Sequence, residues 1–298
     1  MRIDGRIVSQ QILSALTSEI SERARARMIP TLGVILVGSD PGSLSYIRQK
    51  QRAAETIGAR IELVTLPADA PTAKVRTAIE TFNTARTIHG IILQRPLPGH
   101  LRSENVGTVI RPEKDVDGFL PHSPFSPPVS LAVLLLLHLT RAGESGMSDD
   151  GNLWDFTTVI RVTHDTEFPR WLRSKSIVII GRGETSGAPI AASLAKLQCA
   201  TLTVHSKTPD PDVFTRGADI IISCVGKKGT VRSDTIKRGA ILIGVGLWHD
   251  TEGKLHGDYE EKDIDRIASF YTPTPGGVGP VNVACLMGNL VLSAQRSR

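Results

Sequence analysis

The feature that most constrains the fold of this 298-residue chain is a regular alternation of short apolar runs and helical patterns. The clearest run, residues 31–38, is apolar, rich in β-branched residues and bounded by glycine, which is typical of a buried strand. In the first part of the chain these runs are residues 31–38 (TLGVILVG), 60–67 (RIELVTLP) and 88–98 (IHGIILQRPLP), with helical patterns at 8–27, 43–58 and 72–84. Strands joined by helices lie parallel, so the alternation predicts a parallel sheet with helices on its faces.

A second alternation begins near residue 174 and predicts a second α/β domain, a Rossmann-type doubly wound parallel sheet. Its strands are predicted in SIVIIG, TLTVHS, DIIISCVG, AILIGVG and ASFYTP. We expect the first domain to cover residues 1–123 and the second to cover 124–281, with a C-terminal helix, 282–298, packing back on the first domain. The polar stretch from Ala142 to Arg170 is predicted to be an insertion or a surface excursion.

Composition limits the partners that such a chain can bind. The net charge of +5 suits an anionic small molecule or cofactor as well as it suits nucleic acid. Aromatic residues make up only 4%, which argues against stacking on nucleic-acid bases. The three cysteines are widely spaced and no His/Cys cluster has zinc-ligand spacing, so we expect no metal site.

The N-terminus has no signal-peptide pattern and the longest apolar run, residues 131–137, is too short to cross a membrane. We therefore expect a cytoplasmic protein that contacts no membrane.

A glycine-rich turn lies between the first strand and the first helix of the second domain. Gly181, Gly183 and Gly187 follow the strand in IVIIGRGETSGAPIA with the spacing GxGxxxG. Such glycines allow a tight turn and let a pyrophosphate approach the N–H groups at the start of the helix. A glycine-rich turn without a ligand is the alternative, and the flanking strand and helix favour nucleotide binding.

The end of the next strand indicates which dinucleotide would bind. An NAD site usually has an acidic residue there, which binds the ribose 2′-hydroxyl. Here the strand ends in His205, Ser206 and Lys207, without a carboxylate, and Arg182 in the glycine-rich turn adds a second cation. A hydroxyl and cations fit a 2′-phosphate, so we predict NADP as the cofactor in preference to NAD. Lys207 alone could equally be a solvated surface lysine, and the prediction depends on the cluster.

The first domain carries a candidate catalytic lysine. Tyr46 and Lys50 are four residues apart on a predicted helix and share a face, so an aromatic ring would lie beside an amine. A partly buried lysine has a lowered pKa and can transfer protons near neutral pH. An exposed pair on a solvated helix has the same spacing, so spacing alone favours that simpler interpretation.

Polar side chains are also placed where they could meet a ligand of the first domain. Gln94 lies at the carboxyl end of a buried strand, where open α/β sheets bind ligands. Asp115 and Asp117 lie in a glycine-containing loop, PEKDVDGF. The alternatives are a loop-capping amide for Gln94 and an Asx-turn for the two carboxylates. Metal binding by the carboxylates is poorly supported, because no third ligand has suitable spacing.

Together these stretches resemble the bifunctional methylenetetrahydrofolate dehydrogenase/cyclohydrolases of one-carbon folate metabolism. The matching stretches occur in the family's order over nearly the whole chain: VGSDPGSLSYIRQKQ, GIILQRPLP, PEKDVDGF, GRGETSGAPIA, TVHSKT, GAILIGVG and TPTPGGVGPVNVA. No single stretch is specific, but the tyrosine–lysine helix together with the PGGVGP loop is. A short-chain dehydrogenase is a weaker match, because its Tyr-x-x-x-Lys pair would follow the nucleotide motif.

The resemblance implies a folate-binding cleft between the two domains and a role for each candidate residue. It implies that Lys50 is the key catalytic residue and that Gln94 hydrogen-bonds to Lys50 and tunes it. It also implies that Tyr46 stacks along the folate and that Asp117 binds the pterin edge. The substrate would be 5,10-methylenetetrahydrofolate, oxidised with NADP and then hydrolysed to 10-formyltetrahydrofolate, and the protein would be a homodimer built through the nucleotide domains.

The same resemblance extends the site into the second domain. The candidate cofactor-binding residues are Gly181, Arg182, Gly183, Ser206 and Leu247. Pro275, Gly276 and Gly277 in the loop TPTPGGVGPVN, residues 272–282, are candidate substrate-binding residues. The glycines would let the backbone approach a flat folate, and the prolines would limit flexing of the loop.

The sequence departs from the family pattern at several positions. Arg95 stands for a leucine, Phe125 and Val129 are new in a Pro-Cys-Thr-Pro-x-Gly segment, Gly183 stands for a serine, and Gly244 stands for an acidic residue. Several of these changes lie near the nucleotide side. The alternatives are therefore a single-activity member, either dehydrogenase or cyclohydrolase, and a catalytically silent folate- or nucleotide-binding subunit. The intact Tyr46, Lys50, Gln94 and Asp117 argue against the silent subunit.

Overall fold

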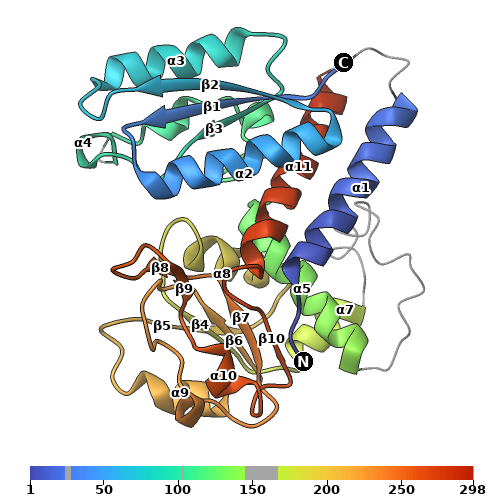
Figure 1. Cartoon of the computed structure of the whole chain (residues 1–298), viewed down its shortest axis with the longest axis vertical. Helices are drawn as coiled ribbons and strands as arrows, with labels where there is room; N and C mark the ends of the chain where they lie inside the picture. Colours follow the sequence, from blue (N-terminus) through green and yellow to red (C-terminus); the bar gives the residue numbers. More distant parts are fainter. Residues whose placement is uncertain (24–27, 103, 145–166, 298) are drawn as a thin grey trace. The chain divides into compact units, whose positions relative to one another are not determined.

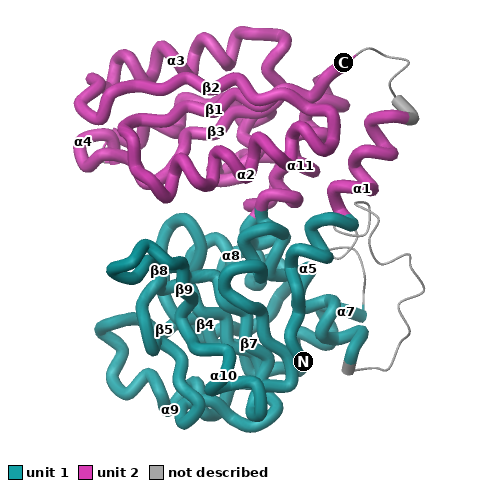
Figure 2. The backbone as a smooth tube through the Cα atoms, viewed as in Figure 1, with its two compact units in different colours: residues 1–11, 129–282 teal, residues 12–128, 283–298 magenta. Residues whose placement is uncertain are grey.

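The chain forms two compact units, each with its own parallel sheet (Figure 1, Figure 2). The computed structural model describes residues 1–23, 28–102, 104–144 and 167–297. Unit 1 comprises residues 1–11 and 129–282, and unit 2 comprises residues 12–128 and 283–298. The predicted class, two α/β domains with parallel sheets, is confirmed. The domain boundary drawn after residue 123 from the sequence stays a prediction.

Unit 2 holds a three-stranded parallel sheet in the order β2-β1-β3. Its strands are β1 (Thr31–Val37), β2 (Arg60–Leu66) and β3 (Gly90–Leu93), and they are connected by α2 (Pro41–Ile57) and α3 (Thr72–Thr84). Figure 1 shows the two helices on opposite sides of the sheet. The central strand β1 is buried along its whole length, which explains its continuous apolar run.

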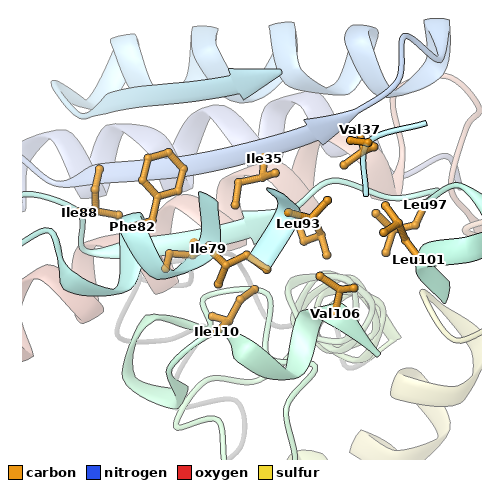
Figure 3. Close-up of a cluster of buried hydrophobic side chains, with 13 residues drawn as sticks. Ile35, Val37, Ile79, Phe82, Ile88, Leu93, Leu97, Leu101, Val106 and Ile110 are labelled. Carbon is orange, nitrogen blue, oxygen red and sulfur yellow. The ribbon is translucent and has the colours of Figure 1, made fainter. Parts of the chain in front are cut away.

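The face of this sheet that carries Ile35 forms a hydrophobic core with α3 (Figure 3). Ile35 packs in one buried cluster with Ile79 and Phe82 of α3 and Leu93 of β3. The segment after β3 completes the cluster through α4 (Gly99–Arg102) and η2 (Val106–Val109), and η3 (Pro112–Lys114) follows. Because side chains alternate along a strand, the other face of β1 is left for α2.

The last helix, α11 (Val278–Arg296), holds a loop of unit 2 in place. Asn289 Nδ2 donates to the backbone oxygens of Val116 and Ser126 at 2.9 and 3.0 Å. These two bonds fix the loop that carries Asp117. By length and composition α11 could cross a membrane, but most of it is buried in the structure, and a buried core helix has the same properties.

The helix α11 begins earlier than the sequence analysis expects. A loop was predicted up to Asn282, but the helix starts at Val278, so Pro280 is its third residue. A proline is tolerated in the first helical turn because the N–H groups there have no intrahelical partner. The first helix, α1 (Gly5–Arg23), likewise begins before the expected residue 8.

Unit 1 holds a five-stranded parallel sheet in the order β10-β7-β6-β4-β5, so the predicted Rossmann-type sheet is confirmed. The strands are β4 (Ile177–Ile180), β5 (Thr201–Val204), β6 (Ile220–Ser223), β7 (Ile241–Gly244) and β10 (Phe270–Tyr271). From β4 the chain first builds β5 on one side and then β6 on the other. The winding therefore reverses between β4 and β6, and the carboxyl ends of these strands form the topological switch point where such sheets bind ligands.

The remaining elements of unit 1 surround this sheet. α8 (Gly187–Lys196) connects β4 to β5, and α9 (Pro211–Gly217) connects β5 to β6. The other elements are α5 (Pro128–Glu144), α7 (Glu167–Arg173), η4 (Ser233–Thr235), α10 (Glu261–Ile264) and the antiparallel hairpin of β8 (Leu247–His249) and β9 (Leu255–Gly257). Most of the predicted insertion at Ala142–Arg170, namely residues 145–166, lies outside the described residues.

Candidate active site

Lys50 lies on the buried face of α2. The helix begins after the N-cap Asp40, whose carboxylate accepts a hydrogen bond from Ser43 N at 2.7 Å. Ser43, Ile47 and Lys50 recur at helical spacing and are all buried. The interpretation of an exposed pair on a solvated helix is therefore wrong for Lys50, and Tyr46 on the same helix is half-buried.

The amine of Lys50 is hydrogen-bonded to Gln94. Lys50 Nζ donates to Gln94 Oε1 at 2.7 Å, and the two residues are 9% and 7% exposed. Burial disfavours the ammonium and lowers the pKa of Lys50, while the nearby charge of Asp117 opposes this shift. An amine with a lowered pKa exchanges protons closer to neutral pH, which is the property that acid–base catalysis needs.

The backbone sets the orientation of the Gln94 amide. Gln94 N extends the sheet by donating to Ile35 O at 2.9 Å, and Gln94 Nε2 donates to Arg95 O at 2.8 Å. Because the amide nitrogen is directed to this carbonyl, the amide oxygen is directed to Lys50. Ser43 Oγ also donates to Arg95 O, at 3.3 Å, which ties the start of α2 to the end of β3.

The two carboxylates of the loop after η3 have different environments. Asp115 is buried and accepts a hydrogen bond from Leu120 N at 2.8 Å, so it stabilises the loop. This bond spans five residues, more than the two residues of the Asx-turn alternative. Asp117 is half-buried, and burial raises its pKa, while the charges of Lys50 and Arg95 partly offset that increase. Asp117 is therefore the carboxylate that interacts electrostatically with the candidate catalytic lysine.

A cavity of about 190 Å³ opens beside Asp117 within unit 2. Its polar wall includes Asp115, Asp117 and Arg95, and Phe119 contributes an aromatic wall. The Arg95 guanidinium lies 5.1 Å from the centre of the Phe119 ring, a cation–π distance. The arginine that stands for the family's leucine is thus part of the pocket wall.

Among the described residues, no three His, Cys, Asp or Glu side chains come together as metal ligands would.

In unit 1, two glycines of the nucleotide turn are required by the turn itself. Gly181 has φ +101°, and a Cβ on Gly187 would lie 2.1 Å from Gly181 O. At Gly183 the nearest atom that a Cβ would meet is Ser186 Oγ at 3.9 Å. Gly183 is therefore not required by packing. The N-cap Ser186 makes no side-chain cap bond to α8, so the first N–H groups of α8 are not capped by that side chain.

The cationic candidates lie at the same edge of the sheet as this turn. β4 and β5 pair in parallel with Ile180 opposite Val204, so the residues that follow the two strands are neighbours. Arg182, Ser206 and Lys207 follow these strands and are exposed. Leu247, at the start of β8, is half-buried and its carbonyl lies against Gly226.

The proline–glycine loop has a packing reason for its glycines. A Cβ on Gly277 would lie 2.5 Å from Pro273 O, and a Cβ on Gly5 would lie 1.9 Å from Gly277 O. Gly276 has φ +108° and is buried beside the side chain of Arg6, whereas Pro275 is exposed. Close packing within unit 1 therefore accounts for both glycines without a ligand, and their contact with folate stays a prediction.

Three departures from the family pattern have structural explanations. A Cβ at Gly244 would lie 2.9 Å from Tyr259 Oη, and this hydroxyl donates to Thr272 O at 2.6 Å, so the tyrosine fills the space next to residue 244. Phe125 and Val129 are both buried, which is the environment that apolar side chains favour.

Comparison with known proteins identifies the family. The model of the family described as "Tetrahydrofolate dehydrogenase/cyclohydrolase, catalytic domain" matches residues 3–117, and that of its "NAD(P)-binding domain" matches residues 157–298. The chain belongs to the tetrahydrofolate dehydrogenase/cyclohydrolase family. The resemblance read from the sequence is thereby confirmed.

Curated relatives of this family match along nearly their whole length. "Bifunctional protein FolD 2" of Desulfitobacterium hafniense (strain Y51) is 33% identical over 295 residues, which cover 97% of this chain and 95% of that protein. "Bifunctional protein FolD" of Bacillus licheniformis is 35% identical over 300 residues, covering 99% of this chain and 97% of that protein.

Solved structures of the family share the fold. The bifunctional enzyme FolD, a methylenetetrahydrofolate dehydrogenase/cyclohydrolase from Campylobacter jejuni, superposes with a TM-score of 0.85 at 30% identity, covering 99% of both chains. The FolD of Trypanosoma brucei, complexed with NADP cofactor and inhibitor, also gives 0.85 at 31% identity and covers 100% of this chain and 98% of that one.

Asp258 does not stand out in the sequence, but the structure places it in contact with a loop at the switch point of unit 1. Asp258 is fully buried and accepts hydrogen bonds from Ser223, Val225 and Lys227. In the sequence it lies in HGDYEE, where three acidic residues within four positions look like a solvated surface run. No local pattern distinguishes Asp258 from such a run, because its hydrogen-bond donors lie 31–35 residues earlier in the chain.

Proposed function

We propose that this chain oxidises 5,10-methylenetetrahydrofolate to 5,10-methenyltetrahydrofolate with NADP and then hydrolyses the product to 10-formyltetrahydrofolate. The observation that carries the proposal is the buried Lys50–Gln94 hydrogen bond of 2.7 Å at the carboxyl end of the unit 2 sheet. Family membership, and relatives named as bifunctional enzymes, support both activities.

The cofactor site lies at the glycine-rich turn of unit 1. NADP, when bound, supplies the nicotinamide that accepts a hydride from the methylene carbon. The residues fit this group: the α8 N–H groups suit a pyrophosphate, and Arg182, Ser206 and Lys207 suit a 2′-phosphate. The complex of the T. brucei relative with NADP supports the same choice. NAD lacks the phosphate that these cations attract, so we expect it to bind less tightly.

The folate side of the reaction depends on the unit 2 residues. The carboxylate of Asp117 would accept hydrogen bonds from the N–H groups of the pterin edge, and the ring of Tyr46 would pack along the flat part of the substrate. Addition of water to the cationic methenyl carbon releases a proton. Lys50 Nζ, held by Gln94, would take up that proton and return it during collapse to the formyl product.

Two parts of the proposal rest on the resemblance alone, namely the contact of Pro275, Gly276 and Gly277 with the folate and the homodimer built through the nucleotide domains. The cytoplasmic location is proposed from the sequence patterns alone. Light scattering tests the dimer directly, since a monomer has a mass of 32.1 kDa. A monomer at assay concentrations would contradict that part without affecting the chemistry.

An absorbance assay tests both activities. With 5,10-methylenetetrahydrofolate and NADP, we expect methenyl absorbance to appear and then decay, and NAD to be less effective. No NADP-dependent conversion would contradict the dehydrogenase. A second assay that starts from methenyltetrahydrofolate isolates hydrolysis, and so distinguishes a bifunctional enzyme from the single-activity alternatives. Ligand binding without turnover in either assay would favour the silent subunit.

A further inference from the structure

Asp258 is a buried carboxylate for which the proposed chemistry has no use. It follows β9 in unit 1, and the residue is 0% exposed. Its Oδ2 accepts hydrogen bonds from Ser223 Oγ at 2.6 Å and Val225 N at 3.1 Å, and its Oδ1 accepts one from Lys227 N at 2.8 Å. A buried carboxylate is costly unless such donors satisfy it, so this arrangement is built into the fold.

The segment that Asp258 holds, residues 223–227, lies at the switch point. It begins at Ser223, the last residue of β6, and β6 pairs with β4, whose carboxyl end leads into the glycine-rich turn. A Cβ on Gly181 would lie 3.0 Å from Cys224 O and 3.3 Å from Val225 Cγ2. Segment 223–227 therefore lies directly against the nucleotide turn.

Two further observations place this segment beside the cofactor site. Cys224 N donates to Ile180 O at 2.8 Å, at the carboxyl end of β4 and directly before the glycine-rich turn. Val225 is 44% exposed, although the preceding residue, Cys224, lies against the turn. An exposed apolar side chain at the switch point is suited to contact a planar ring of a bound ligand.

The packing around Asp258 leaves little room for another arrangement. A Cβ on Gly246 would lie 2.2 Å from Asp258 Oδ2 and 2.3 Å from Gly226 N. Gly226 has φ +71°, and its own Cβ would lie 2.5 Å from Leu247 O. The carboxylate is thus enclosed between segment 223–227 and the strand connection that contains Gly246.

We propose that Asp258 is a positioning residue for the nicotinamide cofactor: its carboxylate holds segment 223–227 in the conformation that receives the dinucleotide. This inference rests on the proposed function, because it requires that unit 1 binds NADP. Asp258 itself would not touch the cofactor. It would act through the amides of Val225 and Lys227, so that cofactor binding does not require the segment to become ordered first.

The variant Asp258→Asn separates this role from chemistry in unit 2. The amide keeps one accepting oxygen but turns an N–H₂ group toward backbone N–H donors, so at least one hydrogen bond is lost. We expect the Kd for NADP, measured by calorimetry on the full chain, to rise about tenfold or more, the effect of losing one charge-assisted hydrogen bond. Cyclohydrolase turnover starting from methenyltetrahydrofolate should change by less than about twofold, because that step needs no NADP.

Ser223→Ala is the matched control. It removes the hydroxyl donor to the same carboxylate but keeps both loop amides in place. We expect a smaller rise in Kd for this variant than for Asp258→Asn. Equal or larger weakening by Ser223→Ala would overturn the role assigned to the amides.

Other outcomes are also decisive. If Asp258→Asn binds NADP as tightly as the wild type, or loses cyclohydrolase activity in parallel with affinity, the inference is wrong. If the wild type itself does not bind NADP, the proposed function fails, and the inference with it. Should Asp258→Asn not fold, hydrogen exchange on the wild type gives the answer. We expect slow exchange at the Val225 and Lys227 amides without NADP, and rapid exchange there would contradict a preformed segment.

Discussion

Replacing Gln94 with glutamate is the sharpest perturbation of the candidate catalytic pair. The change is nearly isosteric and puts a negative charge where Gln94 Oε1 now accepts from Lys50 Nζ at 2.7 Å. At that distance two unit charges attract by about 6 kcal/mol at an effective dielectric constant of about 20. The cost of burying the new carboxylate reduces this figure, but a net attraction of about 2 kcal/mol still favours the ammonium by more than about tenfold.

The cyclohydrolase rate should fall, because Lys50 must be a neutral amine before it can take up a proton. Burial now lowers the pKa of Lys50, which keeps the neutral amine within reach of neutral pH. A carboxylate at position 94 raises the pKa of Lys50 again, so the amine stays charged at neutral pH. We therefore expect Gln94→Glu to lose at least about tenfold in cyclohydrolase rate near neutral pH and to recover part of it at alkaline pH.

The assay follows the decay of methenyl absorbance between about pH 6 and about pH 9, at saturating substrate. The matched control is Gln49→Glu, the same chemical change at an exposed position of α2 next to Lys50. This control should keep the wild-type pH profile. If Gln94→Glu retains the wild-type rate and profile at neutral pH, the reasoning about Lys50 is refuted.

Four further changes test other parts of the structure. Lys50→Met removes an ammonium whose pKa is lowered by burial. Because the unfolded chain holds that proton more tightly, the stability of the wild type relative to the variant should increase as the pH rises toward the unfolded pKa of about 10.4, as measured by urea unfolding. Gly183→Ser should change the free energy of unfolding by less than about 0.5 kcal/mol, since the nearest atom that a Cβ there would meet is Ser186 Oγ at 3.9 Å. Calorimetry should detect NADP binding at least as tight as that of the wild type. Gly244→Asp should destabilise unit 1 by about 1–3 kcal/mol through overlap with Tyr259 Oη, and an unchanged melting temperature would refute that packing. Asn289→Ala should lower the free energy of unfolding by about 1–3 kcal/mol and raise the KM for folate, because it removes two hydrogen bonds to the loop that carries Asp117. An unchanged KM would show that the loop keeps its conformation without these bonds.

The fold was largely predictable because its signals are local. A continuous apolar run such as β1 and the glycine turn at Gly181 mark strands and their connections within a few residues. The start of α11 was missed for a local reason too. Pro280 is a residue type typical of loops, but it lies in the first turn of α11. The N–H groups of a first helical turn make no intrahelical hydrogen bond, so a proline is tolerated there.

The site could be predicted only where a residue type suited to catalysis or binding occurs at a position where this kind of fold binds ligands. Spacing put Tyr46 and Lys50 on one helix face but could not say whether that face is buried, since burial depends on how α2 packs on the sheet. Asp258 was missed because its donors lie 31–35 residues earlier in the chain, and only the folded sheet brings them together.

The central claim is that the buried amine of Lys50 performs the proton transfers of methenyltetrahydrofolate hydrolysis. Its most direct test is the cyclohydrolase rate of Lys50→Ala beside that of Lys74→Ala, the same substitution at an exposed lysine of α3. We expect Lys50→Ala to lose at least about a hundredfold, the usual contribution of a positioned acid–base group, while Lys74→Ala and the NADP affinity of both variants stay at the wild-type level. Cyclohydrolase activity retained in Lys50→Ala would contradict the account.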